Sequence, residues 1–148
     1  RNRYRTKEEI EESRARGLPI VVRLKVPDHG EITFQDTVRG KVTFDLSSLA
    51  DFVILKSDGY PTYHLAHVVD DHAMKITHVI RGEEWISSTP RHILIHQGLG
   101  IEPPKYVHVP VILGSDRSKL SKRHGAASAL EYRDRGYAIR THDLREAA

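Results

Sequence analysis

The sequence predicts an α/β fold in which a parallel sheet follows a small, largely antiparallel unit. Residues 1 to about 50 are rich in β-forming residues in alternating patterns, which are typical of antiparallel strands with one exposed face. From Asp51 onward, strand-like and helix-like segments alternate, which is the pattern of a parallel sheet with helical crossovers. The chain is therefore expected to change architecture near residue 50.

The N-terminal unit is expected to open with a helix. Thr6 and Glu9 have the spacing of a capping box, in which each side chain accepts a hydrogen bond from the other residue's backbone. Gly17 is expected to end the helix, and Pro19 cannot continue it.

Three strands are expected next, over residues 20–26, 31–34 and 38–44. Residues 27–30, Pro-Asp-His-Gly, have the composition of a turn. We therefore expect the first two strands to pair as a hairpin.

The second part of the chain is expected to alternate strands and helices. The elements are a short buried strand over 52–55, a helix over about 63–73, a strand over 77–81, a helix from Ser87 or Ser88 to Gly98 or Gly100, and a strand over 106–113. Pro110 indicates an edge position or an irregular end for the last strand. Ligands of parallel sheets bind beyond the carboxyl ends of the strands. We therefore expect residues 81–84 and 114–125 to meet at one rim.

Composition excludes several classes of protein. The 148 residues contain no Cys, which rules out disulfides and thiolate zinc sites and is compatible with an intracellular location. No run of about 18 apolar residues is present, so we expect no membrane partner and a cytoplasmic protein, or one of an organellar matrix or stroma. The net charge of +3 is compatible with nucleic acid as a partner without requiring it. Because the first residue is Arg, we expect a piece of a longer protein.

Residues 118–125 concentrate cations and hydroxyls between two glycines. Lysine ammonium and serine hydroxyl groups donate well to phosphate oxygens, so the segment indicates a loop that binds a polyphosphate. It is not a Walker A loop, because the second glycine before the lysine is missing. The alternative is a solvated basic loop.

Arg81 leaves a strand directly into Gly82, an arrangement that aims a guanidinium fork at a carboxylate. The alternative is an ion pair with Glu83 or Glu84. Trp85 is interpreted as a packing anchor. The His and Asp residues of the segment 64–72 lack the spacings of known metal sites, and we predict no metal there.

Three ordered motifs resemble one family. They are residues 57–66 (Ser-Asp-Gly-Tyr-Pro-Thr-Tyr-His-Leu-Ala), residues 77–85 (Thr-His-Val-Ile-Arg-Gly-Glu-Glu-Trp) and residues 119–123 (Lys-Leu-Ser-Lys-Arg). Together they resemble bacterial or organellar glutamyl-tRNA synthetases, which are class I aminoacyl-tRNA synthetases, over about residues 20–137.

The resemblance implies a division of the chain. Residues 1–50 are expected to be the C-terminal part of an acceptor-binding insertion, residues 51–137 the second half of a Rossmann-type catalytic domain, and residues 138–148 a divergent tail. The first class I signature, His-x-Gly-His, is absent. We therefore expect the isolated chain not to catalyse aminoacylation.

The resemblance also implies a function, an ATP-dependent ligase that joins L-glutamate to tRNA(Glu) through a glutamyl-adenylate, with Mg²⁺ accompanying ATP and no zinc in this segment. The expected residues are Lys119 and Lys122 for catalysis; Lys122, Ser121, Glu84 and Ile112 for ATP; and Tyr63, His67 and Arg81 for glutamate. Arg39 and Lys41 are expected to face tRNA from the basic side of the β-rich unit, and the alternative for each is a solvated position on a half-exposed sheet. His67 departs from the family, which commonly has Asn at that place.

Two alternatives remain open. One is the shortened paralogue that attaches glutamate to a modified base of tRNA(Asp), although the intact signature at residues 119–123 and the β-rich unit at residues 1–50 favour the full synthetase. The other is a non-catalytic, basic RNA-binding module.

Overall fold

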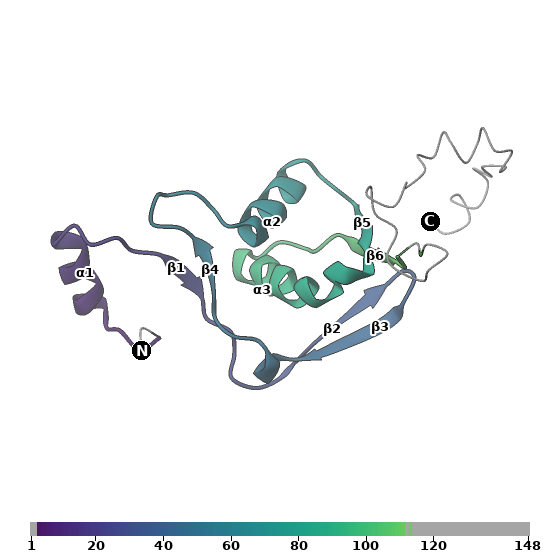
Figure 1. Ribbon diagram of the computed structural model, residues 1–148, viewed down its shortest axis with the longest axis horizontal. Coiled ribbons are helices and arrows are strands. Elements are labelled where there is room, and N and C mark those ends of the chain that lie inside the picture. Colours follow the sequence, from purple (N-terminus) through teal and green to yellow (C-terminus); the bar gives the residue numbers. More distant parts are fainter. Residues whose placement is uncertain (1–2, 112, 114–148) are drawn as a thin grey trace, which may run out of the picture. The chain divides into compact units, whose positions relative to one another are not determined.

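The chain adopts a mixed α/β fold with a partly parallel sheet and a second, small antiparallel sheet (Figure 1). The computed structural model describes residues 3–111 and 113, and residues up to Pro110 belong to one compact unit. Its elements are α1 (Lys7–Ala15), β1 (Val22–Leu24), β2 (Glu31–Asp36), β3 (Gly40–Asp45), the 3₁₀ helix η1 (Leu46–Ser48), β4 (Phe52–Leu55), α2 (Tyr63–Ala73), β5 (His78–Gly82), the 3₁₀ helix η2 (Glu83–Ser88), α3 (Thr89–Leu99) and β6 (Lys105–Val109). Within the described part of the chain, no helix has the length and apolar character needed to cross a membrane.

The larger sheet has the strand order β3-β2-β6-β5. β5 and β6 are parallel, with α3 between them in the chain, as the alternating pattern predicts. β2 is also parallel to β6, through the single pair of Asp36 with Tyr106, and it pairs with β3 in an antiparallel hairpin. The β2–β3 hairpin therefore extends the sheet that β5 and β6 begin.

The hairpin expected around residues 27–30 is wrong. β1 pairs instead with β4 in an antiparallel two-stranded sheet, so β4 does not join the parallel strands either. The backbone N–H of Val26 donates to the Asp51 carboxylate at 2.8 Å, and Pro27 has no N–H to donate. The backbones of residues 26 and 27 therefore offer no N–H group for hydrogen bonds to a neighbouring strand, which a hairpin at this place would need.

Both predicted N-cap residues lie at the starts of their helices, but only one of them makes the expected side-chain hydrogen bond. At α1, the side chain of Thr6 accepts from the backbone of Glu9, and the Glu9 carboxylate accepts from the backbone of Thr6, which confirms the capping box. At α3, Ser88 occupies the N-cap position but its side chain makes no capping hydrogen bond. The reason is that η2 runs directly into α3, so Ser88 already has helical backbone angles.

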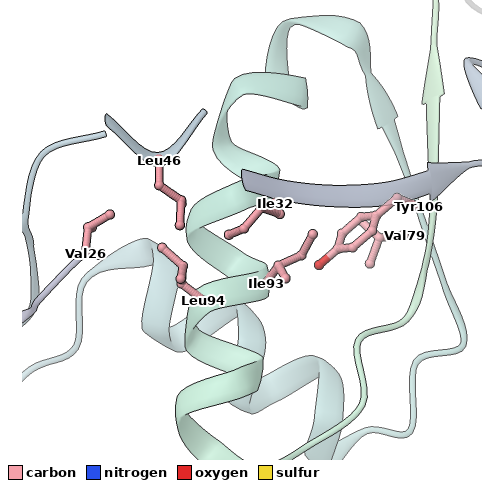
Figure 2. Packing of buried hydrophobic residues seen from close by; sticks show 7 residues of the cluster. All are labelled: Val26, Ile32, Leu46, Val79, Ile93, Leu94 and Tyr106. Atoms are coloured by element: carbon pink, nitrogen blue, oxygen red, sulfur yellow. The ribbon is translucent and has the colours of Figure 1, made fainter. Parts of the chain in front are cut away.

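The hydrophobic core of the unit lies around α3 (Figure 2). Ile93 of α3 points toward Val79 of β5 and Tyr106 of β6, whereas Leu94 lies on the side of Val26 and Leu46. The remaining buried member of the cluster is Ile32. The N-terminal segments and the parallel strands therefore share one core.

The turn between β2 and β3 is built around Asp36. The backbone N–H groups of Val38 and Arg39 both donate to Asp36 Oδ1 at 3.0 Å. Gly40, which pairs with Asp36 across the hairpin, has a φ of +73°, in the left-handed region. A glycine at this position is typical of hairpins with three-residue loops.

We predict that Gly40→Ala lowers the stability of the protein by about 1–2 kcal/mol, because an L-residue is strained in the left-handed region. Thermal unfolding measures the effect. Gly98→Ala is the matched control, since Gly98 lies in α3 without a positive φ and a Cβ there would meet no atom within 4 Å. An unfolding temperature unchanged by Gly40→Ala would contradict the prediction.

Candidate functional site

The buried face of the larger sheet changes from apolar to polar toward the carboxyl ends of its parallel strands. Along β5, buried Val79 is followed two residues later by Arg81, and along β6, buried Tyr106 is followed by His108. β2 ends in the same way at Asp36, whose side chain is fully buried. Since alternate residues of a strand share a face, these polar side chains gather at one end of the sheet.

The guanidinium of Arg81 is held by four neighbours. Its Nε donates to Nε2 of His108 at 3.0 Å, and one terminal nitrogen donates to the Thr89 hydroxyl at 2.8 Å. The other terminal nitrogen contacts Nδ1 of His92 at 3.3 Å. The guanidinium carbon also lies 5.5 Å from the centre of the Tyr106 ring, within the range of a cation–π contact. These contacts fix the plane of the fork.

The three hydrogen bonds leave donors for a ligand. A guanidinium has five N–H groups, and the contacts with His108, Thr89 and His92 use three of them, one on each nitrogen. Two N–H groups remain beyond these three contacts, and the Tyr63 side chain also makes a hydrogen bond with the guanidinium. A guanidinium fork matches a carboxylate. Burial lowers the pKa of Arg81, whereas Tyr106 and Tyr63 favour its charged form. Arginine remains charged in proteins, so Arg81 presents a cation.

Aromatic rings surround this cation. The rings of Tyr63 and His67, one helical turn apart on α2, stack with their centres 5.6 Å apart. The centre of the Tyr63 ring also lies 5.3 Å from that of Trp85, and the centre of the His67 ring lies 4.6 Å from that of His92. Tyr63 and Trp85 are 51% and 39% exposed, so the cluster has an open side. Trp85, which the sequence suggested as a packing anchor, is instead an exposed residue whose ring lies beside Tyr63.

Burial lowers the pKa of two histidines near Arg81, His92 and His67. Burial, followed by the charges of His67 and Arg81, lowers the pKa of His92 to about 2. Because arginine only donates, Nδ1 of His92 must accept from it, and Nε2 of His92 is left to donate to Nδ1 of His64 at 3.0 Å. Burial also lowers the pKa of His67, although Asp71, 3.3 Å away, opposes the shift. His92 is thus a neutral hydrogen-bond acceptor for Arg81.

The other expected residues of the described part lie beside this cluster or on the hairpin. Arg39, near the tip of the hairpin, forms an ion pair with Glu83, directly after β5. Lys41 is exposed on β3. The Glu84 carboxylate folds back over the Cα of Gly82, where a side chain on residue 82 would displace it. Glycine at this position therefore lets the acidic segment turn tightly after Arg81.

Four expected residues, Ile112, Lys119, Ser121 and Lys122, lie outside the described residues, as do the loop at residues 114–125 and the tail. Among the residues that are described, no group of three or more His, Asp or Glu side chains is placed to hold a metal ion.

Sequence reasoning missed Asp36, Thr89, His92 and His108. A signal was nevertheless present, because Asp36 and His108 continue the alternation of buried residues along their strands. A polar residue at a position that the period predicts to be buried needs a partner. His92 stands next to Ile93 within the buried run of α3, where no such alternation distinguishes it.

Comparisons with known proteins agree with this architecture. The family model described as "tRNA synthetases class I (E and Q), catalytic domain" matches residues 1–142. The chain is 61% identical over 121 residues to a glutamate–tRNA ligase of Dehalococcoides mccartyi, covering 82% of this chain and 25% of that protein. It is 52% identical over 137 residues to a glutamate–tRNA ligase of Chlamydia muridarum, covering 93% of this chain and 27% of that protein.

A solved structure gives the same result. The crystal structure of a glutamate tRNA ligase from Elizabethkingia meningosepticum in complex with its amino acid matches with a TM-score of 0.75 and 38% identity. That match covers 91% of this chain and 26% of the other. The chain thus spans about a quarter of the length of the relatives it matches. The resemblance seen in the three sequence motifs is confirmed, and the chain belongs to the class I tRNA synthetases of the glutamate and glutamine group, within their catalytic domain.

Proposed function

We propose that this chain forms part of a ligase that activates L-glutamate with ATP and transfers it to tRNA(Glu). The observation that carries the proposal is the Arg81 guanidinium, which is fixed by hydrogen bonds to His108, Thr89 and His92 and lies at a cluster whose Tyr63 ring is half exposed. A fixed guanidinium of this kind matches a carboxylate. Relatives 52–61% identical to the chain are glutamate–tRNA ligases, which supports the same reading.

Each glutamate-binding residue has a distinct role in this proposal. Arg81 binds the side-chain carboxylate bidentately, and the Tyr63 and His67 rings form the wall along the amino acid. His67 is held by Asp71 on its own helix, which sets the direction of its ring. A site enclosed by rings strengthens the attraction between Arg81 and a carboxylate, because the local dielectric constant is lower than that of water.

The chemistry is a displacement at phosphorus followed by an acyl transfer. An α-carboxylate oxygen of glutamate attacks the α-phosphorus of ATP, a new P–O bond forms, and pyrophosphate leaves with the electrons of the broken bond. A ribose hydroxyl of the terminal adenosine of the tRNA then attacks the carbonyl carbon, loses its proton, and AMP leaves.

The roles toward ATP are proposed from the resemblance alone. Lys122, supported by Lys119 and Ser121, would donate to the charge that builds on the phosphates, and Glu84 and Ile112 would contact ATP. Mg²⁺ enters with ATP and neutralises charge on its phosphate oxygens.

We further propose that residues 51–137 are the second half of a Rossmann-type domain and residues 1–50 the end of an acceptor-binding insertion. Arg39 and Lys41 are on the hairpin of that insertion and are assigned to the tRNA. Arg39 would exchange its ion pair with Glu83 for a phosphate. The proposed site of action is the cytoplasm, or an organellar matrix or stroma.

We predict that Arg81→Gln reduces kcat/KM for glutamate in the full-length ligase about 10- to 150-fold, since hydrogen bonds to charged groups contribute about 1.5–3 kcal/mol. The loss for glutamine should be smaller, because a guanidinium meets a neutral amide with only one good acceptor. ATP–pyrophosphate exchange with each amino acid measures both.

Arg91→Gln is the matched control, because Arg91 lies on α3 over the Phe52 ring and donates to the Ser87 carbonyl oxygen. It should leave the preference for glutamate intact. Equal losses for glutamate and glutamine in Arg81→Gln would assign Arg81 a structural role. Absence of exchange in the wild-type ligase would favour the RNA-binding alternative.

We predict that Lys122→Ala slows adenylate formation about 10²- to 10³-fold, the usual effect of removing a donor to developing charge. Glutamate binding should change little. Single-turnover adenylation measures the rate, and Lys75→Ala, in the turn after α2, is the control. A rate within about threefold of wild type would remove Lys122 from the chemical step.

A further inference from the structure

Beneath Arg81 lies a pair of fully buried residues from two different strands. Nδ1 of His108, on β6, is 2.6 Å from Oδ2 of Asp36, at the end of β2, and both side chains are 0% exposed. We propose that Asp36 and His108 are positioning residues, which set the orientation of the Arg81 guanidinium and thereby the preference for glutamate over glutamine. The inference rests on the function proposed above.

The hydrogen bonds of the pair have only one possible direction. Arg81 Nε is a donor, so Nε2 of His108, 3.0 Å away, must accept and carries no proton. The proton of a neutral His108 is then on Nδ1, where it donates to Asp36. The carboxylate therefore selects the tautomer of His108 that Arg81 needs.

Asp36 is itself held by the backbone. Its Oδ1 accepts from the N–H groups of Val38 and Arg39, each at 3.0 Å, and both of its oxygens lie 3.2–3.3 Å from the backbone nitrogen of His108. Burial alone would raise the pKa of Asp36, but these hydrogen bonds and the one from the His108 ring hold it below its ordinary value. The carboxylate stays ionised, and the turn fixes its direction.

The register of the sheet makes the chain of contacts continuous. Arg81 and His108 are direct partners across β5 and β6, and Asp36 is the partner of Tyr106 across β2 and β6. Thr89 adds a lateral contact, because its hydroxyl lies within 3.3 Å of both His108 Nε2 and Arg81. The direction of the Arg81 fork is thus set from the β2–β3 turn, 72 residues away from His108 in the chain.

Asp36→Asn tests the pair with the least change in shape. In the variant, the oxygen of the new amide must accept from the backbone N–H groups of Val38 and Arg39, so its NH₂ group faces Nδ1 of His108. An NH₂ group there favours the His108 tautomer that carries its proton on Nε2. Two donors then face each other at Arg81, and the guanidinium must shift. In an active site, a displacement of about 1 Å costs about 10²-fold in rate.

In the full-length ligase, we expect Asp36→Asn to raise KM for glutamate about tenfold or more and to reduce the glutamate-to-glutamine ratio of kcat/KM by a similar factor. KM for ATP should stay within about twofold, because a positioning role affects only glutamate. A general structural defect would instead weaken the binding of both substrates. Asp45→Asn is the control, since Asp45 is at the far end of the same hairpin and caps Ser47. Asp45→Asn should change neither the KM for glutamate nor the glutamate-to-glutamine ratio of kcat/KM.

A second pair of variants keeps the test decisive if Asp36→Asn does not fold. The amide of His108→Gln is able to donate toward Asp36 and accept from Arg81, whereas His108→Leu does neither. We expect the glutamine variant to retain most of the preference for glutamate and the leucine variant to lose it. Imidazole ¹⁵N spectra of the wild-type ligase should show His108 protonated on Nδ1.

The outcomes separate the two hypotheses. A wild-type preference for glutamate in Asp36→Asn, or equal behaviour of His108→Gln and His108→Leu, would overturn the positioning role while leaving the proposed function intact. A wild-type ligase without glutamate-dependent exchange would overturn the proposed function, and the role in glutamate selection with it.

Discussion

A guanidinium that is half-buried at the end of a sheet needs hydrogen-bond partners on every side that water does not reach. Leaving a buried charge unpaired costs several kcal/mol, so the positions around Arg81 are constrained more strongly than those of an ordinary core. His108, His92 and Thr89 supply the acceptors, and Asp36 stabilises His108 in turn. A network of this kind depends on every member, because each remaining polar atom is buried without an alternative.

The sheet brings these residues together from distant parts of the sequence. The parallel register of β5 and β6 places Arg81 beside His108, and the antiparallel β2–β3 hairpin joins the same sheet with Asp36 as its last β2 residue. The segment expected to serve an acceptor-binding insertion is therefore hydrogen-bonded to β6, the strand next to β5, and β5 carries the candidate glutamate-binding arginine. Contacts of this hairpin and the geometry of the candidate site are physically linked.

Helices α2 and α3 give the site its other walls. α2 contributes Tyr63 and His67 from adjacent turns, and α3 contributes His92 from a face that otherwise packs in the core. The rings exclude water from one side of Arg81, while Tyr63 and Trp85 leave the other side accessible. Charge recognition in such a setting is selective, because a neutral group gains less from the guanidinium than it loses in hydration.

The sequence by itself determined the elements whose causes are local. The Thr6 capping box, the helix over Tyr63–Ala73 and the alternation of strands and helices were all predictable, because side-chain caps and periodicity act over a few residues. The strand expected over residues 106–113 instead ends at Val109, before Pro110, and it lies between β2 and β5 rather than at an edge. The three ordered motifs at residues 57–66, 77–85 and 119–123 were together sufficient to indicate the family. Only the tertiary structure decided which strands pair. β1 pairs with β4 and not with β2, because the backbone N–H of Val26 donates to Asp51 and is not available for a β1–β2 hairpin. The sheet of β5 and β6 contains β2 and not β4. The partners of Arg81 could not be read from the sequence for the same reason: Asp36 and His108 are 72 positions apart, and only the sheet register makes them neighbours.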